Sequence, residues 1–234
     1  MTQKALTIEG LELHLPPAHS RTGIDILRAL LDMAAKAVAG LQAQSTGPAA
    51  AVGRMRGTGR GIHFRDLVAK LEADHPITLK APFEDSELVA GAAWDVSLLG
   101  GGSSQGGLAK LRWSAGADDL PMHVHEHSDR FIIVDSGRGY FHVSNQDADR
   151  FDGSDVRTIP ARERDVFLFT RGVVHTFSTA DEPMTLLSCQ LPYMAFDDPR
   201  QYRLPGFKWI AREQPETRLQ TVACDAAWSM LTFQ

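Results

Sequence analysis

The feature that most limits how this chain can fold is a change of hydrophobic period near residue 88. From there to residue 191, short runs rich in β-branched and aromatic residues alternate apolar and polar positions, and turn residues separate them. We expect strands at 88–99, 108–114, 121–127, 130–135, 139–144, 156–159, 165–170, 173–179 and 184–191. An array of short strands without helices between them predicts a mainly β fold, as an antiparallel sandwich or barrel.

The chain ahead of this array has a helical pattern. Apolar residues recur at helical spacing over 24–41, and Thr22 with Asp25 three positions later forms a capping-box pattern at its start. A shorter amphipathic segment at 64–71 predicts a second helix. The stretch 45–53 between them is rich in small residues, and we expect it to be a loop.

These patterns divide the chain into three parts. We expect residues 1–80 to form an α-helical N-terminal extension and residues 81–195 to form the barrel. Residues 196–234 are irregular and contain several prolines, and Trp209 and Trp228 within them need an apolar surface to cover. This tail is therefore predicted to pack on the barrel or on a partner subunit.

Composition narrows the class of protein. The 234 residues carry 24 basic and 29 acidic side chains, a net charge of −5, which argues against nucleic-acid binding. Runs of the ~18 apolar residues that cross a membrane are missing, and Glu9 and Glu12 interrupt the apolar N-terminus that a signal peptide would need. The two cysteines, Cys189 and Cys224, are expected to be buried thiols. We predict a cytoplasmic protein that binds neither nucleic acid nor membrane.

Four arginines interspersed with glycines precede the second expected helix. They are Arg54, Arg56, Arg60 and Arg65. Such a cluster can bind an anion, but a solvated loop is the more common role of a run of charges, and we prefer that interpretation.

Histidine is concentrated in one segment. Of the nine histidines in the chain, His123, His125 and His127 lie within five residues of one another. Because alternate side chains of a strand share a face, the His123 and His125 imidazoles project together, about 7 Å apart, and can converge on one metal ion. A polar, exposed strand end would explain this triplet equally well. His142 has no partner at ligand spacing, and its strand leaves a pocket-facing position open.

A second segment, 164–179, joins a strand to another strand through the turn Arg171-Gly172, and the second strand contains His175. Taken together, the two segments resemble the motifs of the cupin superfamily. The matching residues are His123, His125 and Gly137 in the first motif and Gly172 and His175 in the second. Gly116 stands one position away from its place, and Arg164, Thr170 and Thr179 replace the glycine, proline and asparagine of the second motif.

The resemblance covers about half of the chain, residues 85–195. It implies an antiparallel β-barrel of the cupin type, a double-stranded β-helix or jelly roll. It also implies a divalent transition metal, for which imidazole ligands favour Fe(II), with Ni, Zn, Mn or Cu as alternatives. The implied ligands are His123, His125 and His175, which we name the three-histidine core.

One departure from the family pattern affects the ligand set. The position of the family's glutamate ligand falls on Arg130, and a guanidinium cannot ligate a metal. Three ligand sets are therefore possible. The three-histidine core can bind the metal alone, or Asp129 can add a carboxylate ligand if a one-residue bulge turns its side chain toward the metal. His127 can instead be the fourth ligand, because it shares a face with His123 and His125 while the strand stays extended. We prefer the three-histidine core with Asp129 or His127 as a fourth ligand.

The neighbouring side chains suggest a pocket. If His175 faces the barrel interior, Val173 and Phe177 share its direction. Arg130 would anchor a substrate carboxylate if it also faces inward, whereas a surface salt bridge is an equally weighted alternative. Glu126 alternates to the other face, where it is a solvated charge or an outer partner of a ligand.

The resemblance and the neutral ligand set lead to one preferred function. We expect a metal-dependent, dioxygenase-like enzyme that acts on a small anionic or chelating substrate. A non-catalytic cupin that senses a small ligand or a metal is the alternative, and a cupin isomerase is a third. Because open sheets have edges that need covering, we also expect a homodimer.

Overall fold

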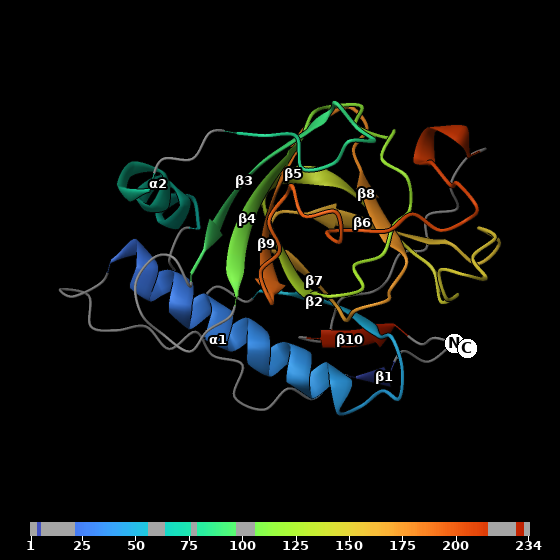
Figure 1. Ribbon diagram of the computed structural model, residues 1–234, viewed down its shortest axis with the longest axis horizontal. Coiled ribbons are helices and arrows are strands. Elements are labelled where there is room, and N and C mark those ends of the chain that lie inside the picture. Colours follow the sequence, from blue (N-terminus) through green and yellow to red (C-terminus); the bar gives the residue numbers. More distant parts are fainter. Residues whose placement is uncertain are drawn as a thin grey trace.

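The computed structural model describes residues 4–5, 22–55, 64–75, 79–96, 106–214 and 228–231. In these residues ten strands form one hydrogen-bonded network and two α-helices accompany it (Figure 1). The predicted mainly β fold with an N-terminal helix is therefore confirmed. None of the described helices combines the length and the apolar character that a membrane crossing requires.

The elements follow the expected order along the chain. The helices are α1 (Gly23–Gln42) and α2 (Phe64–Asp74), and a short 3-10 helix covers Ala211–Glu213. The strands are β1 (Lys4–Ala5), β2 (Ala50–Arg54), β3 (Val89–Asp95), β4 (Gly107–Trp113), β5 (Asp129–Val143), β6 (Arg157–Arg162), β7 (Asp165–Phe169), β8 (His175–Ser178), β9 (Met184–Leu191) and β10 (Trp228–Leu231).

A single long strand, β5, connects the two sides of the barrel. Its first part pairs with β7 and β9, and its second part pairs with β6 and β8. The expectation of separate strands at 130–135 and 139–144 with a turn between them is wrong. The chain instead continues through a register shift between Val134 and Ser136, followed by Gly137 at φ +77°. A bulge bends a strand without ending it, so β5 passes from one sheet to the other.

The expected loop at 45–53 is wrong for its last four residues, 50–53, which lie in β2. This strand pairs antiparallel with β7. Ala51 packs in the apolar cluster under α1, whereas Ala50 and Val52 belong to the cluster inside the barrel. A strand buried on both faces shows no apolar–polar alternation, so periodicity could not reveal it. The barrel sheet thus includes part of residues 1–80, and the division at residue 80 stays a prediction.

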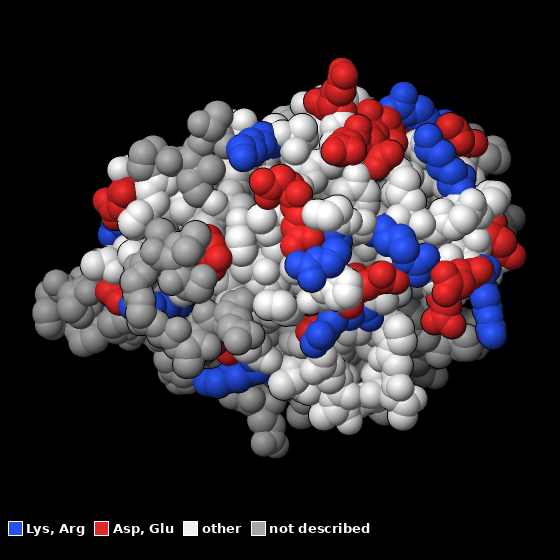
Figure 2. All heavy atoms as spheres, in the orientation of Figure 1, with Lys and Arg blue, Asp and Glu red and all other residues white. Residues whose placement is uncertain are grey.

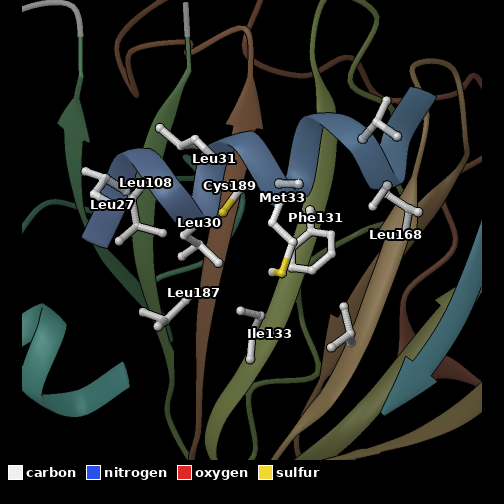
Figure 3. Packing of buried hydrophobic residues seen from close by; sticks show 14 of the residues in the cluster. Leu27, Leu30, Leu31, Met33, Leu108, Phe131, Ile133, Leu168, Leu187 and Cys189 are labelled. Atoms are coloured by element: carbon white, nitrogen blue, oxygen red, sulfur yellow. The ribbon is translucent and has the colours of Figure 1, made fainter. Parts of the chain in front are cut away.

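Helix α1 covers the outer face of the sheet. The capping box is present, because the Asp25 amide donates to Thr22 Oγ1 over 3.2 Å and the Thr22 amide donates to Asp25 Oδ2 over 3.0 Å. The apolar face of the helix packs on strands β4, β5, β7 and β9 (Figure 3). This layer contains Leu27, Leu30, Leu31, Met33, Leu108, Phe131, Ile133, Leu168, Leu187 and Cys189. Cys189 is buried here as expected, whereas Cys224 lies outside the described residues.

The C-terminal segment covers the barrel on another side, where it is orange to red in Figure 1. Trp209 is buried against Val124, Phe151 and Val174. Its ring centroid lies 5.1 Å from that of His142. Of the two surfaces considered for the tail, Trp209 therefore covers the barrel of its own chain.

The described arginines of the glycine-rich segment have acidic partners. Arg54 lies 3.3 Å from an Asp165 carboxylate oxygen, and Arg65 lies 3.9 Å from Glu163. These ion pairs support a structural role for Arg54 and Arg65 over an anion site. Arg56 and Arg60 lie outside the described residues.

The turn between β6 and β7 carries a strained residue. Arg164 is exposed and has φ +75°, the left-handed region in which a Cβ atom is unfavourable, and it stands where the family motif has glycine. Replacement by glycine should relieve that strain, whereas replacement by alanine removes the side chain but keeps the Cβ. We expect Arg164→Gly to have a free energy of unfolding about 0.5–1 kcal/mol higher than Arg164→Ala. Urea unfolding measures both, and an alanine variant at least as stable as the glycine variant would contradict the prediction.

Candidate metal centre

The structure brings the three histidines of the core together. His123, His125 and His175 are buried, and each offers a ring nitrogen within 4.8 Å of those of the other two. His175 opens β8, and His123 lies opposite it in an isolated antiparallel bridge closed by two hydrogen bonds of 2.9 Å. Directly opposed residues project to the same face, and His125 follows His123 at the spacing that returns to that face. Backbone pairing thus places all three imidazoles.

Each imidazole is oriented by a main-chain carbonyl that lies within hydrogen-bond distance of its Nδ1. The carbonyls are those of Pro121 at 3.1 Å from His123, Gln201 at 2.6 Å from His125 and Val173 at 2.9 Å from His175. Because a carbonyl can only accept, each Nδ1 carries the proton and each Nε2 presents a lone pair. Outer partners of this kind fix the tautomer and the ring orientation of histidines that ligate metals.

The surroundings keep the three rings uncharged. Burial lowers the pKa of His123 to about 4, with a smaller contribution from the Arg130 cation. Burial also lowers the pKa values of His125 and His175 well below the usual value, and the neighbouring histidines and Arg130 act in the same direction. At pH 7 the rings are therefore neutral, and a cation can bind without first displacing protons.

The donor set fits a divalent metal. Three neutral imidazoles are ligands that Fe, Ni, Cu and Zn accept in proteins. They also leave coordination positions free for water or a substrate, and they leave the charge of a divalent ion uncompensated. The three imidazoles suit a divalent metal ion because they are buried and share the tautomer that leaves Nε2 free to ligate.

The two candidates for a fourth ligand lie elsewhere. His127 is exposed, because the chain bends at 126–127 and does not continue as a strand. Asp129 is buried, but its carboxylate accepts a hydrogen bond of 2.8 Å from the Arg171 amide and lies 3.4 Å from the Arg171 guanidinium. Neither belongs to the histidine cluster found among the described residues. Glu126 is exposed and pairs with Arg203 at 2.8 Å, as expected for a solvated charge.

Arg130 lies beside the three-histidine core. Only 2% of its surface is exposed, so it is not part of a surface salt bridge. Its Nη1 donates to the main-chain oxygen of Asp129 over 3.3 Å, and its Nη2 has no hydrogen-bond partner. Burial lowers the pKa of the guanidinium to about 9, opposed by the nearby Asp129 charge. Arg130 therefore remains a cation at neutral pH.

These side chains line one small cavity. Its walls are Pro82, Phe83, Leu111, Trp113, His123, His125, Arg130, Ile132, His175, Phe177, Ser188, Gln190, Phe196 and Gln201. The enclosed volume is about 20 Å³, which admits one water molecule. Phe177 lines it as expected, whereas Val173 belongs to the apolar cluster inside the barrel. Sequence reasoning missed Trp113 and Gln201, because no local pattern marks residues that meet only in the folded chain.

Charges are mixed on the visible surface. On the face shown in Figure 2, Lys and Arg side chains are interspersed with Asp and Glu side chains. Arg203, for example, lies 2.8 Å from Glu126 and 3.1 Å from Asp149. The described residues of this face therefore form no basic patch of the kind that nucleic-acid binding needs.

Sequence comparison agrees with this site. Residues 110–189, which contain all three histidines, match the family model described as a cupin domain. These residues of the chain are a cupin domain. No curated protein sequence matches the chain.

Solved structures to which the chain is similar include two oxalate decarboxylases. The Bacillus subtilis enzyme, whose Mn(II) centres have been studied, is 19% identical, with a TM-score of 0.38 over 50% of this chain and 29% of that chain. The Lactobacillus farciminis enzyme, bound to formate, is 19% identical, with a TM-score of 0.39 over 50% of this chain and 32% of that chain. The cupin chain described here thus matches less than a third of the length of either enzyme.

His142 lies away from the cavity of the cupin domain. It is buried, and its ring nitrogens lie 2.8 Å from Thr158 Oγ1 and 2.8 Å from Ser178 Oγ. His142 therefore does not face the pocket, which the sequence had left open. Burial lowers its pKa to about 3.

The buried His142 should make stability depend on pH. Its pKa in the folded protein lies below the unfolded value of about 6.5, so the unfolded chain binds an extra proton between pH 6.5 and pH 3, and stability falls as the pH drops through that range. One such group lowers the free energy of unfolding by about 2 kcal/mol between pH 7 and pH 5. Urea unfolding of metal-free protein at both pH values should show a loss smaller by this amount in His142→Gln. The exposed His127→Gln variant is the control, and equal pH dependence in both variants would refute the assignment.

Proposed function

We propose that this cupin is a metal-dependent, dioxygenase-like enzyme that acts on a small anionic or chelating organic substrate. The observation that carries the proposal is the convergence of three buried, neutral imidazoles beside the Arg130 cation. Fe(II) is the favoured metal, because imidazole suits iron and because reactions with dioxygen need a redox-active centre. When bound, the metal supplies Lewis acidity and one-electron chemistry to ligands in its free positions.

The side chains of the domain have distinct tasks in this proposal. The three-histidine core holds the ion, and the carbonyls on Nδ1 keep the rings in the ligating tautomer. Arg130 binds and orients the anionic part of the substrate, since a guanidinium offers a fork of donors to a carboxylate. Phe83, Phe177 and Phe196 line the cavity and exclude water, which strengthens these electrostatic contacts.

A non-catalytic metal- or ligand-sensing role is the second candidate. It is supported by the enclosed cavity of about 20 Å³, which leaves little room for a substrate unless its walls move. A carboxylate is also missing from the cluster of ligand atoms in the described residues. Metal-loaded protein that binds an organic ligand without converting it would favour this role.

Two further parts of the proposal concern the protein as a whole. We propose a homodimer and a cytoplasmic location. The dimer is supported by β3, which ends the strand order of the described sheet and is paired on its outer side at Gly91, by Lys80, so that a second copy can cover the rest of this edge. Mass measurement in solution tests the dimer.

Metal content gives the first test. Protein purified without an affinity tag should contain about one divalent metal ion per chain, since a single three-histidine core is formed. His175→Ala removes a direct ligand, and its metal affinity should fall by more than the roughly 10- to 100-fold that loss of an outer partner costs. Elemental analysis after dialysis measures both proteins. His127→Gln should retain the metal, and equal retention by His175→Ala would refute the metal site.

Oxygen uptake tests the reaction. With Fe(II) and a panel of diketones, thiols and catechols, the wild-type protein should consume oxygen with at least one compound, while His175→Ala should stay at background. His127→Gln is the matched control, because it changes a histidine that lies outside the cavity. A wild-type rate no higher than that of His175→Ala across the panel would exclude the oxygenase proposal while leaving metal binding to the preceding test.

A further inference from the structure

Unpaired polar atoms converge on the metal cavity. Five buried side-chain nitrogen or oxygen atoms among the described residues lack a hydrogen-bond partner, and two of them belong to Arg28 and Arg157, which have interactions elsewhere. The other three are Trp113 Nε1, Arg130 Nη2 and Gln201 Oε1, and all three residues line the metal cavity. Folded proteins leave few such atoms unpaired, because each forgoes its hydrogen bond to water. Their convergence indicates a second polar subsite.

The three residues come from separate elements. Trp113 ends β4, Arg130 lies at the start of β5 and Gln201 follows β9 in the C-terminal segment. None of these positions requires a polar side chain for strand pairing, which uses only the main chain. A single buried water could satisfy some of these atoms, and the test below distinguishes that explanation from a ligand.

The charge of the subsite specifies one part of the ligand. Arg130 is a buried cation, and the Asp129 carboxylate next to it is occupied by Arg171. No carboxylate lines the cavity among the described residues, and the three histidines are neutral. Because Asp129 is shared with Arg171, it compensates the buried Arg130 cation only in part, and an incompletely compensated buried charge is unfavourable. The ligand that completes the site therefore brings an anionic group to Arg130.

The other two atoms specify a neutral polar group. The indole nitrogen of Trp113 can only donate a hydrogen bond, and the Gln201 side-chain oxygen can only accept one. A hydroxyl group does both, because it has one proton and two lone pairs. The remaining walls are apolar, formed by Leu111, Ile132 and Phe177 with the covering aromatic rings, so the rest of the ligand is small and apolar.

We infer that the cavity binds a small hydroxycarboxylate, with its carboxylate on Arg130 and its hydroxyl accepting a hydrogen bond from Trp113 Nε1. Gln201 Oε1 accepts the hydroxyl proton. This inference deepens the proposed function and rests on it, since it names the substrate class of the same site. The cavity must widen to admit a ligand larger than water, and two of its lining residues, Phe83 and Phe196, lie on connecting segments outside the strands.

Calorimetric titration of metal-free protein with three small probes tests the inference. Glycolate has both groups, acetate lacks the hydroxyl, and glycolamide lacks the charge. We expect glycolate to bind about tenfold more tightly than acetate, the net effect of the two hydrogen bonds of its hydroxyl, and glycolamide to bind at least about tenfold more weakly than glycolate. Equal binding of glycolate and glycolamide, or no binding of any probe, would overturn the inference and leave a buried water as the occupant.

Two variants assign the contacts. Trp113→Phe keeps an aromatic ring against Phe177, whose centroid lies 5.9 Å away, but loses the N–H. It should reduce the preference for glycolate over acetate, with acetate binding unchanged and the contact to Gln201 retained, and an unchanged ratio of the two affinities contradicts the contact with Trp113. Arg130→Met fills similar space without charge, and it should lose both anions while retaining metal.

Metal analysis of the same proteins, after they are loaded with a divalent metal and dialysed, separates the two proposals. If the protein prefers glycolate over the other probes but never retains metal, the proposal of a metal-dependent enzyme is rejected and the hydroxycarboxylate site is kept. Metal retention without discrimination would remove the hydroxycarboxylate alone. The exposed His127→Gln variant should behave as the wild type in both measurements, which shows that a histidine substitution does not by itself disturb binding.

Discussion

The pair of main-chain hydrogen bonds between His123 and His175 is the contact on which the rest of the site depends. It places two imidazoles on one face, brings the third through His125, and does so with atoms that every residue possesses. Burial follows from this position inside the barrel, and burial keeps the rings neutral. The main-chain carbonyls that accept from Nδ1 then leave Nε2 of each ring free to ligate a metal. Geometry, charge and tautomer of the donor set thus derive from one local pairing.

The C-terminal segment is part of this arrangement. The Gln201 carbonyl holds His125 Nδ1, and its side chain faces the cavity. Arg203, two residues later, pairs with Val124 in a second isolated bridge, and Trp209 covers the barrel beyond it. The tail that looked irregular in sequence therefore orients a metal-site histidine and closes the pocket. Loss of its packing would alter both.

Periodicity was enough to predict the elements that have one buried face. The helix over 24–41 follows this rule, whereas β7 and β8 are buried throughout and were predicted from their β-rich composition and the turns around them. Periodicity failed for β2, where Ala50 and Ala51 are buried on opposite faces, and for β5, where the chain passes through Gly137 without a turn. The histidines could be found because their spacing is local. Trp113 and Gln201 could not, because only the tertiary fold brings them to the cavity.

The replacement of the family's glutamate by Arg130 changes what the cavity must bind. A carboxylate ligand would lower the charge of a divalent ion by one unit, whereas a buried guanidinium raises the total to three positive charges. No described side chain that lines the cavity offsets them. Proteins tolerate such a charge only where something compensates it, and Asp129, which is shared with Arg171, does so only in part. The anionic ligand that we propose would supply the rest, so the departure from the family pattern says more about that ligand than the histidines that conform to the pattern.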